Sequence, residues 1–212
     1  MSNSIPPLIP RRVLLGAPKR WQPTISPNGE QLAYLAPDNR DVLQIWVRTL
    51  NNSDDRCVSR ARRPVWFYAW SRDSKTVFCF QDQDGDENWH VHAIDLESQN
   101  VRDLTPWQGV RCHYIVSSPT RPNEILALLN VRNRRLMDVW RIDLRTGATT
   151  LDVENPGDVA WWIADDDLAV RASRGWTPQG GAEVRVRSDA TSPWRTLIQT
   201  SPDEVAYPLG FS

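Results

Sequence analysis

The sequence predicts an all-β protein made of β-propeller blades, each a sheet of four antiparallel strands. The first observation is a repeated phrase of apolar strand, turn and second strand, which occurs at residues 25–35, 70–80, 116–129 and, more weakly, 162–170. The second is an alternating strand that follows the phrase, at residues 44–50, 90–96 and 139–144. Corresponding positions lie 45 to 48 residues apart. A period in the forties built of short strands is typical of propellers.

Each element of the repeat has a local reason. In residues 44–49 the branched side chains Ile45, Val47 and Thr49 alternate with Gln44, Trp46 and Arg48, which predicts a strand with two unlike faces. Residues 26–29, Ser-Pro-Asn-Gly, have proline and glycine at the positions that a type I turn favours. Residues 145–148 predict a similar turn later in a blade. The expected fourth strands are residues 56–58, 101–104, 150–153 and 195–198. No segment keeps a period of 3.6 residues, so we expect few helices.

The repeat also divides the chain. We expect an N-terminal lead segment at residues 1–19 and a partial propeller at 20–212. The expected blades are approximately residues 20–60, 61–106, 107–154 and 155–200, with the start of another at 201–212. In that last stretch Ser212 corresponds to Ser26 and Ser71. We therefore expect about four blades in an open arc. A closed four-bladed ring is the alternative, and it requires the tail to pack on the first blade.

Composition limits the classes of function. The chain of 212 residues is 40% hydrophobic and carries a net charge of −1, which gives no electrostatic argument for binding nucleic acid or a membrane. We expect most of the 11 tryptophans to pack between blades. Cys57, Cys79 and Cys112 have no metal-ligand spacing, and free thiols in a reducing compartment, the cytoplasm, are expected.

Several stretches go beyond the general pattern of a propeller. In chain order they are residues 8–16, 26–29, 43–47, 81–91, 102–106 and 138–147. Together they resemble the N-terminal propeller of the prolyl oligopeptidase family of serine peptidases, most closely its acylaminoacyl-peptidase and dipeptidyl-aminopeptidase branch. The resemblance covers essentially the whole chain. Its most specific part is Asp-Gly-Asp-Glu-Asn-Trp-His at residues 84–90.

The resemblance implies a propeller of seven or eight blades, followed in the parent chain by an α/β-hydrolase domain with a Ser-Asp-His triad. It also implies that the propeller covers the active site and admits short peptides. This chain departs from that pattern, because it has no Gly-x-Ser-x-Gly motif and its only histidines, His90, His92 and His113, lie inside the repeats. We therefore expect no catalytic residue, cofactor or metal in this chain, and the hydrolase domain as its partner.

The candidate functional residues form one loop, Asp84, Asp86, Glu87, Asn88 and Trp89, expected to contact the hydrolase domain or the substrate chamber. An EF-hand calcium loop is disfavoured, because that spacing requires glycine and glutamate where this chain has Glu87 and Ala93. A solvated hairpin turn fits better.

Other clusters have ordinary interpretations beside functional ones. His90 and His92 share a strand face and supply half a metal site at most. The basic residues 60–63 and 132–135 are expected to be solvated loop charges, with steering of a substrate carboxylate or pairing with a partner domain as the alternatives. For the chain as a whole, two alternatives to a peptidase propeller remain: a TolB-like or WD-repeat-like scaffold for protein partners, and a closed four-bladed lectin-like or structural protein.

Overall fold

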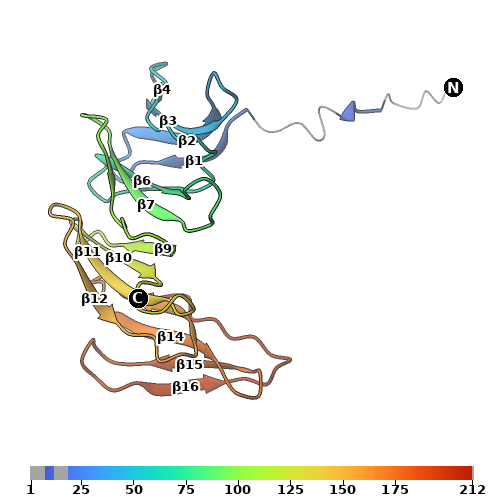
Figure 1. Cartoon of the computed structure of the whole chain (residues 1–212), viewed down its shortest axis with the longest axis vertical. Helices are drawn as coiled ribbons and strands as arrows, with labels where there is room; N and C mark the ends of the chain where they lie inside the picture. Colours follow the sequence, from blue (N-terminus) through green and yellow to red (C-terminus); the bar gives the residue numbers. More distant parts are fainter. Residues whose placement is uncertain (1–7, 12–18, 212) are drawn as a thin grey trace.

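The computed structural model describes residues 8–11 and 19–211, and the sixteen elements that it defines there are all β-strands. They form four antiparallel sheets of four strands each, and in every sheet the spatial order of the strands follows the chain. Figure 1 shows the sheets following one another along an open arc, with β4 and β16 at its opposite extremes. The all-β prediction with four-stranded blades is confirmed, and the closed four-bladed ring is not observed.

The strands coincide with the repeats. The first sheet contains β1 (Trp21–Ile25), β2 (Gln31–Pro37), β3 (Leu43–Thr49) and β4 (Arg56–Cys57). The second contains β5 (Tyr68–Trp70), β6 (Thr76–Gln81), β7 (His90–Asp95) and β8 (Val101–Asp103). The third contains β9 (Cys112–Ser117), β10 (Glu124–Leu129), β11 (Asp138–Asp143) and β12 (Thr149–Val153). The fourth contains β13 (Val159–Ala164), β14 (Val170–Trp176), β15 (Ala182–Val186) and β16 (Arg195–Gln199). All four expected fourth strands are present.

A buried serine closes the hairpin between the first two strands of a blade. Ser26 Oγ accepts a hydrogen bond from Gln31 N at 2.9 Å, while Gly29 N donates to Ser26 O at 2.8 Å. Gly29 has φ of 75°, a conformation that glycine adopts without strain. Ser71 and Ser118 occupy the same position in the next two blades and are also buried. The repeated serine is therefore the buried anchor of a largely exposed turn, and its hydroxyl accepts a hydrogen bond from the backbone of the turn.

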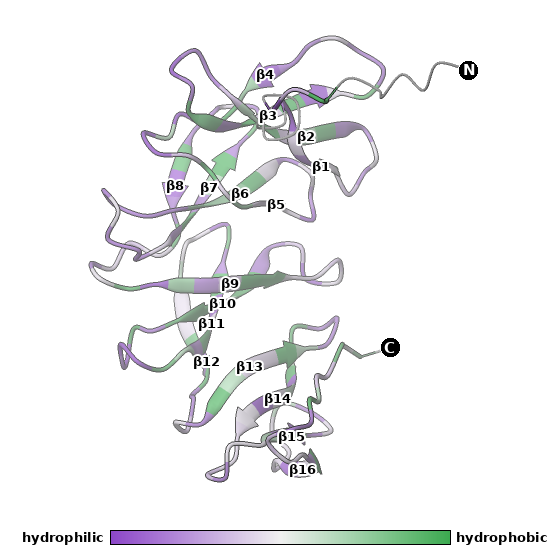
Figure 2. Ribbon diagram, turned by 90° about the vertical axis from the view of Figure 1, so that its right-hand side faces the viewer, coloured by the Kyte–Doolittle hydropathy of each residue, from purple (hydrophilic) through white to green (hydrophobic). Residues whose placement is uncertain are grey.

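The hydrophobic core consists of three clusters, one at each junction between neighbouring sheets. β6 shows why: Val77 and Cys79 pack toward the first sheet, whereas Phe78 and Phe80 pack toward the third. Because alternate side chains of a strand point to opposite faces, a blade between two others needs apolar residues at every position of its inner strands. Figure 2 shows this hydrophobic character along the strands and hydrophilic residues in many of the connecting loops.

The repeat period also appears as direct contacts between turns of consecutive blades. Asn28 N donates to Ser74 Oγ at 3.0 Å, across 46 residues of sequence. Arg72 Nε donates to Ser117 Oγ at 3.1 Å, across 45 residues. These hydrogen bonds join the first sheet to the second and the second to the third, in addition to the hydrophobic contacts between their faces.

Two expectations about burial are only partly correct. Gln44, predicted to share the polar face of its strand with Arg48, is completely buried and is hydrogen-bonded to Ser59 and Ala61. Of the eleven tryptophans, only Trp70 and Trp162 are buried. The exposed ones are Trp21, Trp66, Trp161 and Trp176. Three of these four lie in or just before a first strand, at the exposed edge of a junction: Trp21 meets Trp66 across the first junction, and Trp161 stacks on Tyr114 across the third.

The ends of the chain give less information on the predicted domains. Most of the expected lead segment, and Ser212, lie outside the described residues. Residues 201–211 contain no strand. This stretch runs back along the fourth sheet, where Arg174 Nε donates to Ala206 O at 2.9 Å and the Arg174 guanidinium stacks on the Tyr207 ring. A further blade beginning at residue 201 stays a prediction. Among the described residues there is no helix with the length and hydrophobicity that spanning a bilayer requires.

Candidate functional site

The loop predicted to be functional joins β6 to β7 and folds around its own Asp86. The Asp86 carboxylate accepts hydrogen bonds from Asn88 N at 3.0 Å, Asn88 Nδ2 at 2.9 Å and Gln83 N at 3.2 Å. The hydrogen bonds from Asn88 are the main reason that the pKa of Asp86 is lowered. Asp84 and Glu87 have positive φ angles of 54° and 59°. The loop is therefore a tight turn held by the Asp86 carboxylate, which is ionised at neutral pH.

The five predicted residues do not converge on one point. Asp84, Asp86 and Glu87 are exposed, whereas Trp89 is partly buried and packs on the core between the second and third sheets. The carbonyl oxygen of Trp89 accepts a hydrogen bond from Cys112 N at 2.8 Å, which ties the end of the loop to the third blade. No group of three possible metal ligands occurs among the residues that the structure describes.

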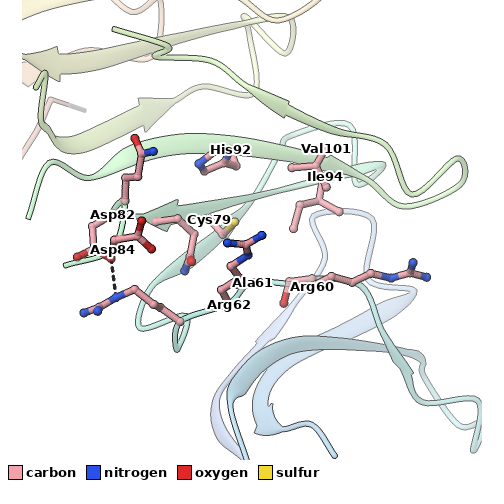
Figure 3. Close-up of a pocket in the computed structure, with 13 residues that line it drawn as sticks. Arg60, Ala61, Arg62, Cys79, Asp82, Asp84, His92, Ile94 and Val101 are labelled. Atoms are coloured by element: carbon pink, nitrogen blue, oxygen red, sulfur yellow. Dashed lines mark ion pairs between the residues drawn. The ribbon is translucent and has the colours of Figure 1, made fainter. Parts of the chain in front are cut away.

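The acidic side of this loop borders a cavity of about 440 Å³ between the first and second sheets. Figure 3 shows Arg60 and Arg62 on one side of it and Asp82 and Asp84 on another. Arg63 Nε lies 3.0 Å from Asp82 Oδ1, and the Asp82 side chain is almost fully buried. This ion pair attaches the loop to the segment that connects the two blades. The rim therefore offers two further arginines to an anionic or polar ligand.

The floor of the same cavity holds a cysteine and a histidine that lie opposite each other on β6 and β7, Cys79 and His92. Burial raises the pKa of the Cys79 thiol to about 12, so the thiol stays protonated at neutral pH. Burial also lowers the pKa of His92, so its imidazole stays neutral. Because a thiolate is the reactive form of cysteine, this pair has no nucleophile. The cavity is suited to binding and not to covalent catalysis.

The other predicted clusters have structural partners. The rings of His90 and His92 stack at 6.4 Å on one strand face, and His90 Nδ1 is 2.7 Å from Asp103 Oδ2. In the basic stretch 132–135, Arg132 Nη2 is 3.1 Å from Oδ1 of the fully buried Asp138. Arg132 thus pairs with a buried carboxylate while its own side chain stays 36% exposed, and this pairing leaves it unable to steer a substrate.

A second cavity, of about 340 Å³, lies between the second and third sheets and was not anticipated from the sequence. Its lining residues are Trp66, Phe67, Phe80, Trp89, Arg111, Cys112 and His113. The sequence analysis missed this cavity because it assigned most tryptophans to the core. The adjacent pair Trp66–Phe67, just before a first strand, is the feature of the sequence that could have predicted it, because two adjacent large rings cannot both point into one junction.

Comparisons with known proteins agree with this architecture. No protein-family model matches the sequence. The chain is 34% identical over 189 residues to dipeptidyl aminopeptidase BIII of Pseudoxanthomonas mexicana, a match that spans 88% of this chain and 27% of the relative. The chain thus corresponds to about a quarter of the length of that protein.

Solved structures show the same fold at low sequence identity. Prolyl oligopeptidase B from Galerina marginata superposes with a TM-score of 0.63 at 15% identity, over 95% of this chain and 31% of that chain. TolB from Acinetobacter baumannii superposes with a TM-score of 0.58 at 16% identity, over 87% of this chain and 45% of that chain. Such identities establish the fold alone. The chain is therefore similar in sequence to part of a dipeptidyl aminopeptidase and similar in fold to the blades of a prolyl oligopeptidase, as the resemblance in its sequence predicts.

Proposed function

We propose that this chain is the substrate-gating propeller portion of a serine peptidase that cleaves short peptides. The observation that carries the proposal is the 34% identity to a dipeptidyl aminopeptidase over 88% of the chain. The fold supports it, since the four sheets form successive blades of an open arc to which further blades can be added.

In this proposal the chain contributes shape and binding surface, and the nucleophile belongs to an α/β-hydrolase domain C-terminal to it in the parent protein. The chemistry of Cys79 and His92, which lie opposite each other in the first cavity, agrees with the proposal, because this pair lacks a thiolate. Gating is steric: rigid blades with apolar junctions exclude folded proteins and let short, extended peptides pass. Such selection needs no catalytic residue in this chain.

The loop at residues 82–89 is the part of the second blade that we assign to contact with the hydrolase domain or the substrate chamber. Its exposed carboxylates, Asp84 and Glu87, project from a turn that is fixed from two sides, by the Arg63–Asp82 ion pair and by the hydrogen bonds to Asp86. A fixed turn presents charges at defined positions, which an interdomain contact or a substrate amine requires.

The test uses the full-length protein that contains this chain. The purified protein should release p-nitroaniline from dipeptidyl p-nitroanilides and should cleave short peptides. It should leave intact a folded protein that contains the same peptide sequences. Asp84→Asn and Glu87→Gln should change the KM for peptides, or should separate the melting transitions of the propeller and the hydrolase domain. Asp73→Asn, at an exposed turn residue of the same blade, is the control and should change neither. Absence of any peptidase activity in the full-length protein would overturn the proposal.

A second candidate function is a non-catalytic scaffold for protein partners. The observation in its favour is the superposition on TolB, at a TM-score close to that of the oligopeptidase. Blade architecture alone does not separate the two. Stable protein partners in an affinity purification, together with an inactive full-length protein, would favour the scaffold.

We also propose that the protein works in the cytoplasm. All three cysteines, Cys57, Cys79 and Cys112, are free, which suits a reducing compartment. Cell fractionation with a tagged copy of the gene tests this, and recovery of the protein outside the cytoplasmic fraction would contradict it.

A further inference from the structure

We propose that the cavity between the second and third sheets binds the C-terminal residue of a peptide, with its aromatic or large apolar side chain among the rings and its carboxylate beside Arg111. This inference rests on the proposed peptide-handling function and identifies a subsite for it. The cavity volume of about 340 Å³ is at the lower end of the range for small-molecule sites, which suits one residue and part of the next.

The walls are aromatic and are held in place by the fold. Phe67 and Phe80 meet edge to face, with ring centroids 5.3 Å apart, and Phe80 N donates to Phe67 O at 3.4 Å, which extends the pairing of β5 with β6. Trp66 is supported on its other side by Trp21 at 6.4 Å, also edge to face. Such contacts fix the rings before a ligand arrives, which lowers the entropy cost of binding.

These rings are accessible. Trp66 and Phe67 are each 51% exposed, although they are neighbours of the completely buried Val65. An exposed pair of large apolar side chains in a folded protein indicates a surface that binds something apolar. Both residues directly precede β5, the first strand of the second sheet.

The cavity carries one sign of charge. None of its seven lining residues is acidic, and Arg111 takes part in no ion pair with another described residue. The backbone of Arg111 is held by Asn130, whose Oδ1 accepts from Arg111 N at 2.6 Å. The pKa of His113 is lowered, mainly by burial and also by Arg111, so the neighbouring imidazole adds no charge at neutral pH.

Aromatic walls with a single guanidinium match one end of a peptide better than its middle. An internal residue presents two neutral amide groups to Arg111, whereas a C-terminal residue presents a carboxylate that accepts two charge-assisted hydrogen bonds from the planar guanidinium. A free amino terminus would place a like charge beside Arg111 and is excluded. Arg111 and the aromatic walls therefore favour the C-terminal residue of a peptide whose side chain is an aromatic ring or a branched apolar group.

The test uses probes without a peptide bond, so that hydrolysis does not interfere, and the full-length protein. Phenylpropionate carries the ring and the carboxylate, phenylpropanamide lacks the charge, and propionate lacks the ring. Binding is followed by ligand-observed NMR titration. We expect saturable binding of phenylpropionate that is roughly tenfold tighter than that of the amide, since hydrogen bonds between ionised groups are about twice as strong as neutral ones. Propionate should not bind measurably.

Variants localise the effect. Arg111→Gln should reduce the affinity for phenylpropionate to that for the amide, and Trp66→Ala should weaken both ring-containing probes. The matched controls are Arg121→Gln, an exposed arginine in the turn before β10, and Trp176→Ala, a similarly exposed tryptophan on β14. Unchanged melting temperatures ensure that each variant is folded.

Equal affinities for acid and amide, or equal effects of Arg111→Gln and Arg121→Gln, would overturn the inference. So would absence of binding to the full-length protein, which would mean that another part of the chain fills the cavity. Dipeptidyl p-nitroanilide hydrolysis on the same samples separates the two proposals. Peptidase activity without probe binding would refute only the proposed subsite. Probe binding without peptidase activity would refute only the proposed peptidase function.

Discussion

Gln44 is the side chain whose replacement should test most directly how the first blade is joined to the second. From its buried position in β3, Gln44 Oε1 accepts hydrogen bonds from Ser59 Oγ at 2.6 Å and Ala61 N at 3.0 Å, and Gln44 Nε2 donates to Ala61 O at 2.9 Å. Gln44→Leu keeps a similar volume but removes all three hydrogen bonds. We predict that the variant is less stable than the wild type.

The magnitude follows from what is left without a partner. A buried donor or acceptor that loses its partner costs about 1–3 kcal/mol. Ser59 is buried and its hydroxyl proton loses its acceptor, although Ser59 Oγ still accepts from Ile45 N, so this loss belongs near the middle of that range, at about 2 kcal/mol. Ala61 O keeps the hydrogen bond from Arg40 Nη2 at 3.0 Å, and only Ala61 N, which is partly buried, loses its partner at a cost of about 0.5 kcal/mol. The greater hydrophobicity of leucine returns about 1 kcal/mol. The free energy of unfolding should therefore fall by about 1.5 kcal/mol.

Urea denaturation followed by tryptophan fluorescence measures this difference, which should appear as a lower midpoint with an unchanged slope. Gln31→Leu is the matched control, because Gln31 Oε1 is buried without a hydrogen-bond partner among the described residues and leucine leaves no partner unpaired. We expect the control to be neutral or slightly stabilising. If both variants lose the same stability, or if Gln44→Leu loses none, the reasoning is refuted.

Three further predictions address the cavities and the loop. In the folded protein at about pH 8, iodoacetamide should leave Cys79 and Cys112 unmodified, because burial raises the pKa of both thiols; intact-mass analysis that finds either one alkylated would contradict this. Arg63→Gln removes the ion pair to Asp82 and should speed amide hydrogen exchange across residues 82–89, and unchanged exchange there would show that the pair does not hold the loop. Burial lowers the pKa of His92 below its ordinary 6.5, so the unfolded chain binds a proton more readily than the folded one. Stability should hold above about pH 6.5 and fall on acidification below it, and His92→Phe should reduce that fall in urea titrations; an identical pH profile in the variant would rule out His92 as a source.

The strands were predictable because the repeat carries two independent signals. The turn phrase around Ser26 and Ser71 marks where each hairpin lies, and the alternating strands that follow it give the spacing between blades. The second strands, such as β6, are continuous apolar runs whose length and flanking turns distinguish them from helices. Local chemistry therefore determined the elements, and the period determined how they group into sheets.

Burial within a strand was less predictable, because it depends on the neighbouring blade. Gln44 alternates with Ile45 and Val47 in sequence, yet it is as deeply buried as they are, since the connection at residues 59–61 covers it. A period of two specifies which side chains share a face of the strand, but it does not specify whether that face is exposed to solvent. The same limitation applies to Trp66, whose exposure depends on how the second and third sheets diverge.

Two tyrosines in first strands bridge different junctions between sheets. Tyr68 and Tyr114 lie in the first strands of the second and third sheets, but not at corresponding positions. Tyr68 pairs with Cys79, whereas Ile115 pairs with Ala127, the counterpart of Cys79, so Tyr114 is one residue off and lies on the opposite face of its sheet.

Tyr68 donates backward, to Ala33 O in the first sheet at 2.8 Å, whereas Tyr114 donates forward, to Trp162 O in the fourth sheet at 2.7 Å. Neither hydroxyl therefore crosses the junction between the second and third sheets. The two tyrosine hydroxyls thus serve the other two junctions, and the junction between the second and third sheets holds the opening lined by the Trp66–Phe67 pair and Arg111. A shift of one residue along the first strand thus decides which junction a tyrosine hydroxyl bridges, and the junction that neither hydroxyl bridges is the one with the aromatic cavity.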